Sequence, residues 1–192
     1  MTKHLDLGCG KYPMNPYGSQ ELYGVDLRKI ESDRKDFTYK SVDLVKEPIP
    51  FEDGYFDSLS AFDFLEHIPR SVSLPSGGVS FPFVDLMSEI YRVLRVGGKL
   101  YAVTPCYPSL AAFSDPTHVN VVTIKTHEYF CGDKPLATIY GFKGKFKANK
   151  AFRTYSAVGN DAHSTAFKHR LKHLRKTLKG QLSHVFWELE KI

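Results

Sequence analysis

Short apolar runs separated by turn-rich connections follow one another along most of the chain, a pattern typical of an α/β domain. A strand buried on both faces of a parallel sheet is apolar almost throughout, so these runs predict strands. One longer segment, Val84–Leu94, instead has its apolar residues at helical spacing and predicts an amphipathic helix, which we expect Gly97 and Gly98 to end in a left-handed cap. The predicted strands are His4–Leu7, Leu22–Asp26, Tyr39–Leu44, Phe56–Phe62, Lys99–Thr104, Phe146–Ser156 and His184–Glu190.

The connections differ in their turn signals. Lys11–Gln20 contains prolines and a glycine, which argues against a long helix and predicts a short, irregular element. The charged segment Arg28–Asp36 indicates an exposed linker. Arg70–Phe83, rich in proline and glycine, predicts a mobile loop suited to a lid or to substrate contact. Thr123–Cys131 predicts a short helix.

Polar groups gather where the first three predicted strands end. Gly8 and Gly10 follow the first strand, and glycine lets the backbone turn sharply and present bare amides to a ligand. Asp6 stands beside this turn. Asp26 ends the second strand, where a carboxylate can accept hydrogen bonds from both hydroxyls of a ribose. Asp43 on the third strand is placed to accept from an adenine amino group.

The same turn lacks the G-x-G-x-x-G spacing that packs a helix against a pyrophosphate. An acid beside a glycine turn is a poor host for a diphosphate and a good host for a cation. A nicotinamide-dependent dehydrogenase is therefore the disfavoured alternative.

In this order the segments resemble the class I S-adenosylmethionine-dependent methyltransferases, closely over 3–104 and loosely beyond. The resemblance implies a Rossmann-like three-layer α/β/α sandwich with a seven-stranded, mostly parallel sheet of order 3-2-1-4-5-7-6, in which strand 7 is antiparallel. It implies one domain over 1–192, with a cofactor-binding half at 1–104 and acceptor-side elements at 105–192. The segments that carry it are Asp6–Gly10, Leu22–Asp26, Val42–Leu44, Gly54–His67 and Glu89–Thr104.

S-adenosyl-L-methionine is the cofactor that the resemblance implies. The family usually has a third glycine where Tyr12 stands, so the chain departs from the pattern there. Since the cofactor brings its own leaving group, the protein contributes chiefly proximity and alignment, with proton removal as an option. The expected cofactor-binding residues are Asp6, Gly8, Cys9, Gly10, Asp26, Leu27, Asp43, Leu44, Phe62 and Asp63.

Two histidines are candidate catalytic residues. His67 lies in the segment that borders the transferred methyl group in the family. His118 lies in a polar loop after the fifth strand, on the ligand side of the sheet, and Asp115-Pro-Thr-His118 resembles a stretch of small-molecule and saccharide methyltransferases. We expect His118 to act on the acceptor as a general base. The alternative for both histidines is capping or packing of their loops.

These observations predict an enzyme that transfers a methyl group to an oxygen or nitrogen of a small-molecule, saccharide or lipid-like acceptor. Two alternatives stay open: a methyltransferase acting on RNA or protein, and a non-catalytic module that binds S-adenosylmethionine. A pyrimidine-C5 methyltransferase using Cys106 as its nucleophile is disfavoured, because the motifs of base handling are missing.

Charge is uneven: the net charge is +5, and much of the basic excess lies between Lys143 and Lys179. Within 163–179, leucines and a phenylalanine recur at helical spacing among lysines and arginines, which predicts a basic amphipathic helix. Such a helix suits an anionic membrane surface or nucleic-acid phosphates. We favour a helix packed on the sheet with a solvated basic face, so a nucleic-acid partner is not favoured and peripheral membrane contact stays open.

Composition bounds the remaining classes. The content of 42% hydrophobic and 24% charged residues is ordinary for a soluble globular domain, and no apolar run approaches the roughly 20 residues of a membrane span. Three cysteines without metal-ligand spacing indicate a reducing, cytoplasmic setting and no metal site. The chain enters a strand almost at once, so we expect no signal peptide.

Overall fold

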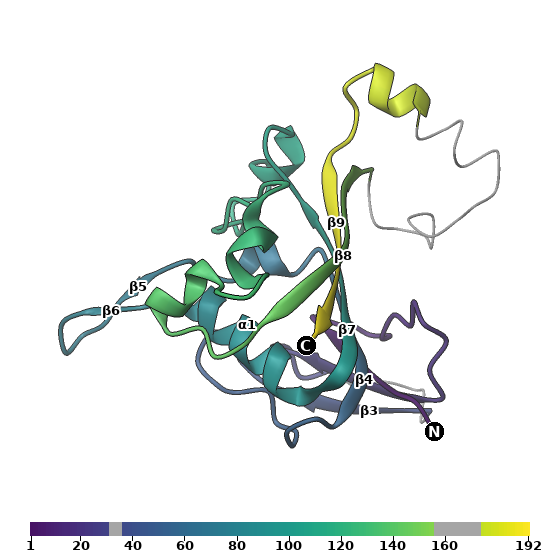
Figure 1. The fold of residues 1–192 in the computed structure, drawn as a ribbon, viewed down its shortest axis with the longest axis vertical. Coiled ribbons are helices and arrows are strands. Elements are labelled where there is room, and N and C mark those ends of the chain that lie inside the picture. Colours follow the sequence, from purple (N-terminus) through teal and green to yellow (C-terminus); the bar gives the residue numbers. More distant parts are fainter. Residues whose placement is uncertain (31–35, 156–173) are drawn as a thin grey trace.

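The computed structural model describes residues 1–30, 36–155 and 174–192. Its centre is a seven-stranded sheet in the order β3-β2-β1-β4-β7-β9-β8 (Figure 1). The strands are β1 Lys3–Leu7, β2 Glu21–Asp26, β3 Phe37–Ser41, β4 Phe56–Phe62, β7 Leu94–Pro105, β8 Phe146–Thr154 and β9 His184–Lys191.

Strand directions confirm the predicted topology. The strands β1, β2, β3, β4 and β7 pair in parallel, whereas β9 is antiparallel to both β7 and β8. With β7, β8 and β9 as the fifth, sixth and seventh strands of the sheet, the order is the expected 3-2-1-4-5-7-6. The carboxyl ends of five parallel strands therefore meet at one edge, which is where ligands bind in open α/β sheets.

One face of the sheet is covered by the helix α1, Pro82–Val93. Pro82 begins the helix, a position where the missing amide hydrogen costs no hydrogen bond. The buried residues of α1 include Leu86, Met87 and Ile90, which join the main hydrophobic cluster of the sheet. The apolar residues that recur at helical spacing in the sequence are therefore buried along one face of the helix.

The expected glycine cap of this helix is wrong. Leu94 is already extended and β7 begins there, so Gly97 and Gly98 lie inside the strand. Gly97 has φ 74°, and the pairing of β4 with β7 shifts register at this point. A Cβ atom on Gly98 would come within 2.8 Å of the Arg95 carbonyl oxygen. The two glycines therefore form a bulge in a long strand.

The opposite face is covered near its centre by the connection between β1 and β2. Residues 8–20 contain no helix, as predicted. Tyr17 from this segment packs against Tyr101, with ring centroids 6.0 Å apart, and its hydroxyl donates to Glu188 at 3.0 Å. Tyr101 forms a second buried cluster with Val103 and Phe186. An irregular loop thus covers part of the sheet that a helix would otherwise cover.

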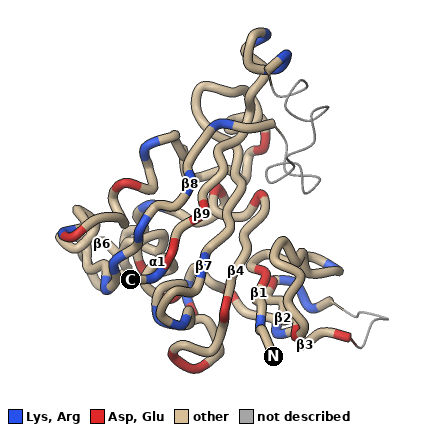
Figure 2. The backbone as a smooth tube through the Cα atoms, turned by 45° about the vertical axis from the view of Figure 1, so that its right-hand side comes forward, with Lys and Arg blue, Asp and Glu red and all other residues tan. Residues whose placement is uncertain are grey.

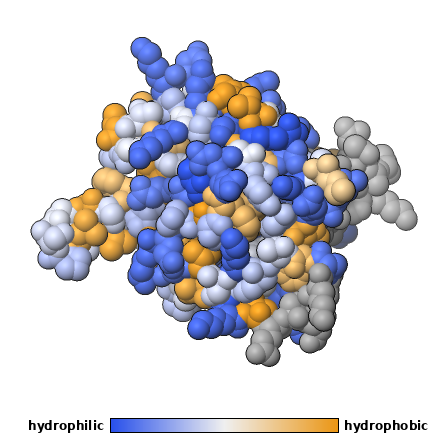
Figure 3. All heavy atoms as spheres, turned by 90° about the horizontal axis from the view of Figure 1, so that it is seen from below, coloured by the Kyte–Doolittle hydropathy of each residue, from blue (hydrophilic) through white to orange (hydrophobic). Residues whose placement is uncertain are grey.

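Short elements follow β4 and β7. Arg70–Phe83 is not wholly irregular, because it contains the hairpin β5 Val72–Ser73 and β6 Val79–Ser80 and the first turn of α1. The hairpin projects from the body (Figure 1), and this extension carries apolar surface (Figure 3), including Leu74. The 3₁₀ helices are η1 Leu65–His67, η2 Leu110–Ala112, η3 Thr126–Phe130 (within the predicted short helix) and η4 Leu136–Tyr140.

The basic segment is described only in part. Residues 163–173 of the predicted helix lie outside the described residues, and 174–178 form a helical turn away from the sheet (Figures 1 and 2). Leu174 and Leu178 are 56% and 80% exposed, so this turn does not pack on the sheet as we expected. Among the described residues, no helix is long and apolar enough to cross a membrane.

Candidate functional site

The glycine turn after β1 is tied to the end of β2. The amides of Gly8 and Cys9 both donate to the Val25 carbonyl oxygen, at 2.9 and 3.1 Å. Gly8 has φ 66°, and a Cβ atom there would lie 2.5 Å from the Phe64 ring. Glycine is therefore required at this position both for the turn and for the close approach of the segment after β4.

Asp6 is buried beneath the turn and braces it. Its Oδ1 accepts from the Ser60 hydroxyl at 2.5 Å and its Oδ2 from the Met14 amide at 2.8 Å. Hydrogen bonds of 2.8 and 2.7 Å join the ring of His4 to Ser60 and to Ser58. Burial raises the pKa of Asp6 to about 7, although the Ser60 hydrogen bond opposes the shift, and burial lowers the pKa of His4 to about 4. A buried network of hydrogen bonds therefore supports the glycine turn.

Asp26 at the end of β2 holds its carboxylate toward the same turn. Its Oδ2 accepts from the Gly10 amide at 2.9 Å, and its Oδ1 accepts from the Arg28 amide at 3.0 Å. Burial alone would raise the pKa of Asp26, but the hydrogen bonds from Arg28 and from the two amides outweigh it and hold the pKa below its usual range. The group is thus ionised and aligned at the topological position of a ribose-binding acid.

The guanidinium of Arg28 also binds this carboxylate through two hydrogen bonds. Nε donates to Oδ1 and Nη2 to Oδ2, each at 2.9 Å. Two parallel N–H donors present the same pattern as the two hydroxyls of a ribose. The Arg28 side chain is 69% exposed and its fork is the nearest group to a Cβ atom built on Gly10, at 3.6 Å. The exposed Arg28 side chain therefore occupies both oxygens of the carboxylate that the sequence predicts to bind a ribose.

Asp43 lies in a turn after β3, because the strand ends at Ser41 and does not extend to Leu44 as predicted. Its Oδ1 accepts from the Val45 amide at 3.1 Å, and Oδ2 pairs with Lys46 at 2.8 Å. The Lys46 ammonium, supported by the Val45 amide, holds the pKa of Asp43 below its usual range. This carboxylate is partly exposed, and its contact with an adenine stays a prediction.

The other predicted cofactor residues are placed in several environments. Cys9 and Leu44 are buried, whereas Leu27 is 67% exposed. Phe62 packs on Tyr101 at the end of β4, with ring centroids 5.3 Å apart. Asp63 has φ 46°, a left-handed conformation, and its Oδ1 pairs with His184 Nε2 at 3.1 Å.

A second polar cluster forms at the ends of β4 and β7. The 3₁₀ helix η1 supplies Glu66 and His67, and the loop after β7 supplies His118. The His67 and His118 rings meet edge to face with centroids 4.9 Å apart, and His118 Nε2 lies 3.8 Å from Glu66 Oε1. The structure thus brings together the two histidines that the sequence singled out.

Glu66 is the member of this cluster that the sequence reasoning missed. It is 1% exposed, its Oε2 accepts from the Thr104 hydroxyl at 2.6 Å, and burial raises its pKa. Within the described part of the chain, its Oε1 and the Nδ1 of His118 are buried without a hydrogen-bond partner. The position of Glu66 next to His67 could have pointed to it. The sequence does not show, however, that its carboxylate is buried.

Thr117 orders the exposed side of the cluster. Its amide and hydroxyl both bond Asp115 Oδ1, at 2.8 and 2.6 Å, and its hydroxyl lies 3.1 Å from His67 Nδ1. Asp115 Oδ2 is left facing His118 Nε2 at 3.9 Å. The Asp115–His118 loop therefore holds its side chains in defined positions.

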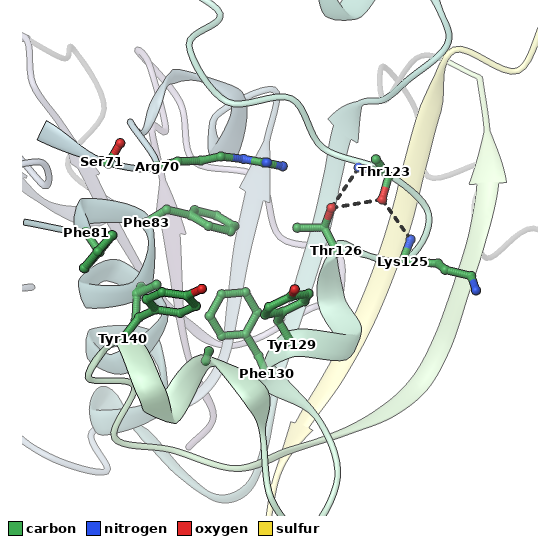
Figure 4. A pocket seen from close by; sticks show the side chains of 12 residues that line it. Arg70, Ser71, Phe81, Phe83, Thr123, Lys125, Thr126, Tyr129, Phe130 and Tyr140 are labelled. Carbon is green, nitrogen blue, oxygen red and sulfur yellow. Dashed lines mark hydrogen bonds between the residues drawn. The ribbon is translucent and has the colours of Figure 1, made fainter.

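An aromatic cavity of about 500 Å³ is lined by residues of α1, η3 and η4 and by Arg70 (Figure 4). Its wall includes Phe83 and Phe130, with ring centroids 5.5 Å apart, and Tyr140. Arg70 extends along one side and its Nε donates to Asn120 Oδ1 at 2.7 Å. The Asn120 amide donates to the Glu66 carbonyl at 2.9 Å, which connects the cavity wall to the cluster.

Cys106 is not a nucleophile in this arrangement. It is fully buried in the main core, and burial raises the pKa of its thiol. A reactive thiol needs a lowered pKa and access to its target. The site therefore offers carboxylates, amides and imidazoles but no activated sulfur in this position.

Comparison with known proteins decides the family. Residues 5–102 match the model of a methyltransferase domain, a region that includes the glycine turn, all three acids and the Glu66–His67 pair. The chain belongs to this methyltransferase family. With the strand order and directions described above, this family is that of the class I S-adenosylmethionine-dependent methyltransferases.

Individual relatives are distant. The methyltransferase is 24% identical over 148 residues to a probable chloroplastic tocopherol O-methyltransferase of Oryza sativa subsp. japonica, covering 67% of this chain and 37% of that protein. It is 26% identical over 126 residues to a chloroplastic tocopherol O-methyltransferase of Arabidopsis thaliana, covering 58% and 32%. The chain thus spans about a third of the length of these curated relatives.

A solved S-adenosylmethionine-dependent methyltransferase of Archaeoglobus fulgidus has the same fold. The TM-score is 0.59 at 18% identity, with 100% of this chain and 86% of the other covered. At the cofactor end, the donor set of this methyltransferase fits S-adenosylmethionine. The carboxylate of Asp26 suits a diol once Arg28 moves aside, and Arg28 Nη2 lies 3.6 Å from a Cβ atom built on Gly10.

Proposed function

We propose that this methyltransferase transfers the methyl group of S-adenosylmethionine to a hydroxyl oxygen of a small molecule with an apolar or aromatic body. The observation that carries the proposal is the meeting of two imidazoles and a buried carboxylate at the ligand edge of the sheet, connected through Asn120 and Arg70 to an aromatic cavity. The distant O-methyltransferase relatives, named for tocopherol, support an acceptor of this kind.

On the cofactor side, each acid has a part. Asp6 and the Gly8–Gly10 turn, whose amides already donate to Val25 and Asp26, border the methionine end. Asp26 holds the ribose hydroxyls, and Asp43 holds the adenine. These residues lie after β1, β2 and β3, whose carboxyl ends meet at the edge where ligands bind in such sheets. The remaining predicted contacts, Cys9, Leu27, Leu44, Phe62 and Asp63, are assigned to the walls of the same site.

On the acceptor side, His118 and His67 assist loss of the hydroxyl proton. The acceptor oxygen forms a bond to the methyl carbon as the carbon–sulfur bond breaks, S-adenosylhomocysteine leaves, and the proton must depart from the oxygen. Imidazoles near the reacting oxygen favour that departure. Since Glu66 and both histidines come from the segments after β4 and β7, they act on the acceptor and not on the ribose or adenine.

The aromatic cavity is assigned to the body of the acceptor. Its rings offer apolar contact, and Arg70 with Asn120 connects it to the reacting end. Pockets lined by apolar and aromatic side chains with few polar groups are typical of small-molecule sites.

The test is transfer of radiolabelled methyl from S-adenosylmethionine to tocopherol and a series of simpler phenols. Tyr140→Ala removes one cavity wall and should raise KM for an accepted phenol several-fold while kcat changes less. Ile139→Ala is the matched control, because Ile139 lies in the same 3₁₀ helix, is 74% exposed and does not line the cavity. No transfer to any phenol by a protein that binds S-adenosylhomocysteine would contradict the proposal.

A further inference from the structure

We propose that Glu66, His67 and His118 bind one divalent transition-metal ion, of the zinc or manganese type, at the acceptor end of the site. The inference deepens the proposed function and rests on it for the role of the ion, although metal binding itself is testable separately. Within residues 1–30, 36–155 and 174–192, this is the cluster whose nitrogen and carboxylate atoms come close enough together, all within 4.8 Å of one another.

Glu66 keeps a buried carboxylate oxygen without a partner. The residue is 1% exposed, yet its Oε1 has no hydrogen bond among the described residues. The side chain of His118 is 9% exposed, and its Nε2 lies 3.8 Å from this oxygen. A buried carboxylate oxygen without a partner destabilises the fold. Glu66 Oε1 therefore points to a bound group that satisfies it.

The second argument is the spacing. Ligand atoms bound to one zinc ion at about 2.0–2.1 Å lie about 3.3 Å apart in a tetrahedral site. His118 Nε2 and Glu66 Oε1 are 3.8 Å apart, and all three ligand atoms are within 4.8 Å. Small side-chain rotations therefore close the site. Asp115 Oδ2, 3.9 Å from His118 Nε2, is placed at the rim where a fourth ligand or an acceptor oxygen binds.

The third argument is that the ligands are already oriented by their neighbours. The Thr104 hydroxyl holds Oε2 of Glu66 at 2.6 Å, which directs Oε1 toward His118. Thr117 bonds both His67 Nδ1 and Asp115 Oδ1. Outer partners of this kind fix ring orientation in metal sites. Two imidazoles and one carboxylate select transition metals over Mg²⁺ and Ca²⁺, which prefer oxygen ligands.

The role of the ion follows from its place at the acceptor end, which Asn120 and Arg70 connect to the aromatic cavity. A hydroxyl oxygen that binds the ion at an open position becomes more acidic, so its proton leaves to solvent. The oxygen then bonds to the methyl carbon as the carbon–sulfur bond breaks and S-adenosylhomocysteine leaves. The ion is not consumed and no electron is transferred. The histidines then assist proton loss by holding the ion.

The test is calorimetric titration of Zn²⁺ into the full chain after treatment with a chelator and its removal. We expect one Zn²⁺ per chain in the wild type, and binding at least tenfold weaker in Glu66→Gln and His118→Gln. Thr117→Val keeps all three ligands but removes the orienting hydroxyl, so it should weaken binding about 10- to 100-fold. His127→Gln is the matched control, because His127 is also buried with an unpartnered ring nitrogen but lies outside the cluster.

Folding is checked by S-adenosylhomocysteine affinity, and His67→Gln, at a partly exposed ligand, replaces any variant that fails to fold. Absent Zn²⁺ binding, or equal binding by the wild type and every variant, overturns the inference. If Zn²⁺ does not bind but methyl transfer to a phenol proceeds, the metal inference fails and the proposed function stands. If Zn²⁺ binds as expected but no acceptor is methylated, the metal site stands and the proposed function fails.

Discussion

The proposed cofactor end and the proposed acceptor end of the site differ in how their polar groups are satisfied. After β1, β2 and β3, the carboxylates of Asp6, Asp26 and Asp43 each accept hydrogen bonds from backbone or side-chain donors. After β4 and β7, Glu66 Oε1 and His118 Nδ1 are buried with none among the described residues.

In the proposed function, this difference separates the groups that bind the cofactor from the groups that assist methyl transfer. The acids of the cofactor end are held ready by the chain itself, and ligand donors exchange with or add to those already present. The acceptor end leaves buried atoms unsatisfied at a cost of about 1–3 kcal/mol each. Such a cost is typical of a binding or catalytic site. We therefore expect mutations at the cofactor end to change cofactor affinity and mutations at the acceptor end to change turnover.

The largest expected effect is loss of turnover in His118→Ala. Removal of a group that assists proton transfer typically costs about 100- to 10,000-fold, so kcat with an accepted phenol should fall at least 100-fold. The assay is methyl transfer at saturating S-adenosylmethionine, with His127→Gln as the control. Near-normal turnover would return His118 to a role in loop packing.

The next effect is loss of cofactor affinity in Asp26→Ala. The ionised carboxylate should accept both ribose hydroxyls, and its removal leaves them without that partner. A cost of about 2–3 kcal/mol corresponds to about 30- to 150-fold weaker S-adenosylhomocysteine binding. Asp133→Ala is the control, since Asp133 is a 94% exposed acid that pairs with Lys145. Unchanged affinity in Asp26→Ala would show that the ribose binds elsewhere.

A smaller effect concerns pH and Asp6. Burial raises the pKa of this carboxyl to about 7 in the folded protein, above its usual 3.8. The group is thus ionised above about pH 7 and protonated below it. Only the ionised form attracts the ammonium group at the amino-acid end of the ligand, so S-adenosylhomocysteine affinity should fall up to about tenfold from pH 8 to pH 6.

Asp6→Asn tests the origin of that pH dependence. Its affinity should be weak and nearly constant over the same interval, because the titrating carboxyl is gone. Calorimetry at pH 6, 7 and 8 makes the comparison. An identical pH dependence in the wild type and in Asp6→Asn would assign it to another group.

The smallest expected effect is a gain in cofactor affinity in Arg28→Ala. The guanidinium fills the diol position on Asp26 but is 69% exposed, and an ion pair of this kind is worth about 0.2–1 kcal/mol. Freed of this competitor, Asp26 should bind S-adenosylhomocysteine up to about fivefold more tightly. Arg28→Lys, which keeps the charge but loses the fork, should fall between the two. Weaker binding in Arg28→Ala would mean that Arg28 contacts the cofactor.

Much of the fold was predictable because strands buried on both faces leave a strong apolar signal. The strand Phe56–Phe62 was predicted with its observed bounds, and the order of the sheet followed from the family resemblance. The bulge at Gly97–Gly98 was misread as a helix cap, since a glycine pair has the same local signature in both settings. The exposed leucines at 174 and 178 show that helical spacing alone does not place a helix on a sheet.

The candidate site was predictable in its residue types and less so in its arrangement. The acids beside the glycine turn and the two histidines were found from motif order. The contact of Arg28 with Asp26 was not, because Arg28 looked like the start of a charged linker. Glu66 was also missed. Its burial and orientation depend on contacts with Thr104 and His118, which are 38 and 52 residues away in the sequence.

One calorimetric experiment tests the separation of the two ends most directly. S-adenosylhomocysteine is titrated into the wild type, Asp26→Ala and His118→Ala under the same conditions. The account predicts unchanged affinity in His118→Ala and about 30- to 150-fold weaker affinity in Asp26→Ala. Loss of affinity in His118→Ala, or equal affinity in all three proteins, would contradict it.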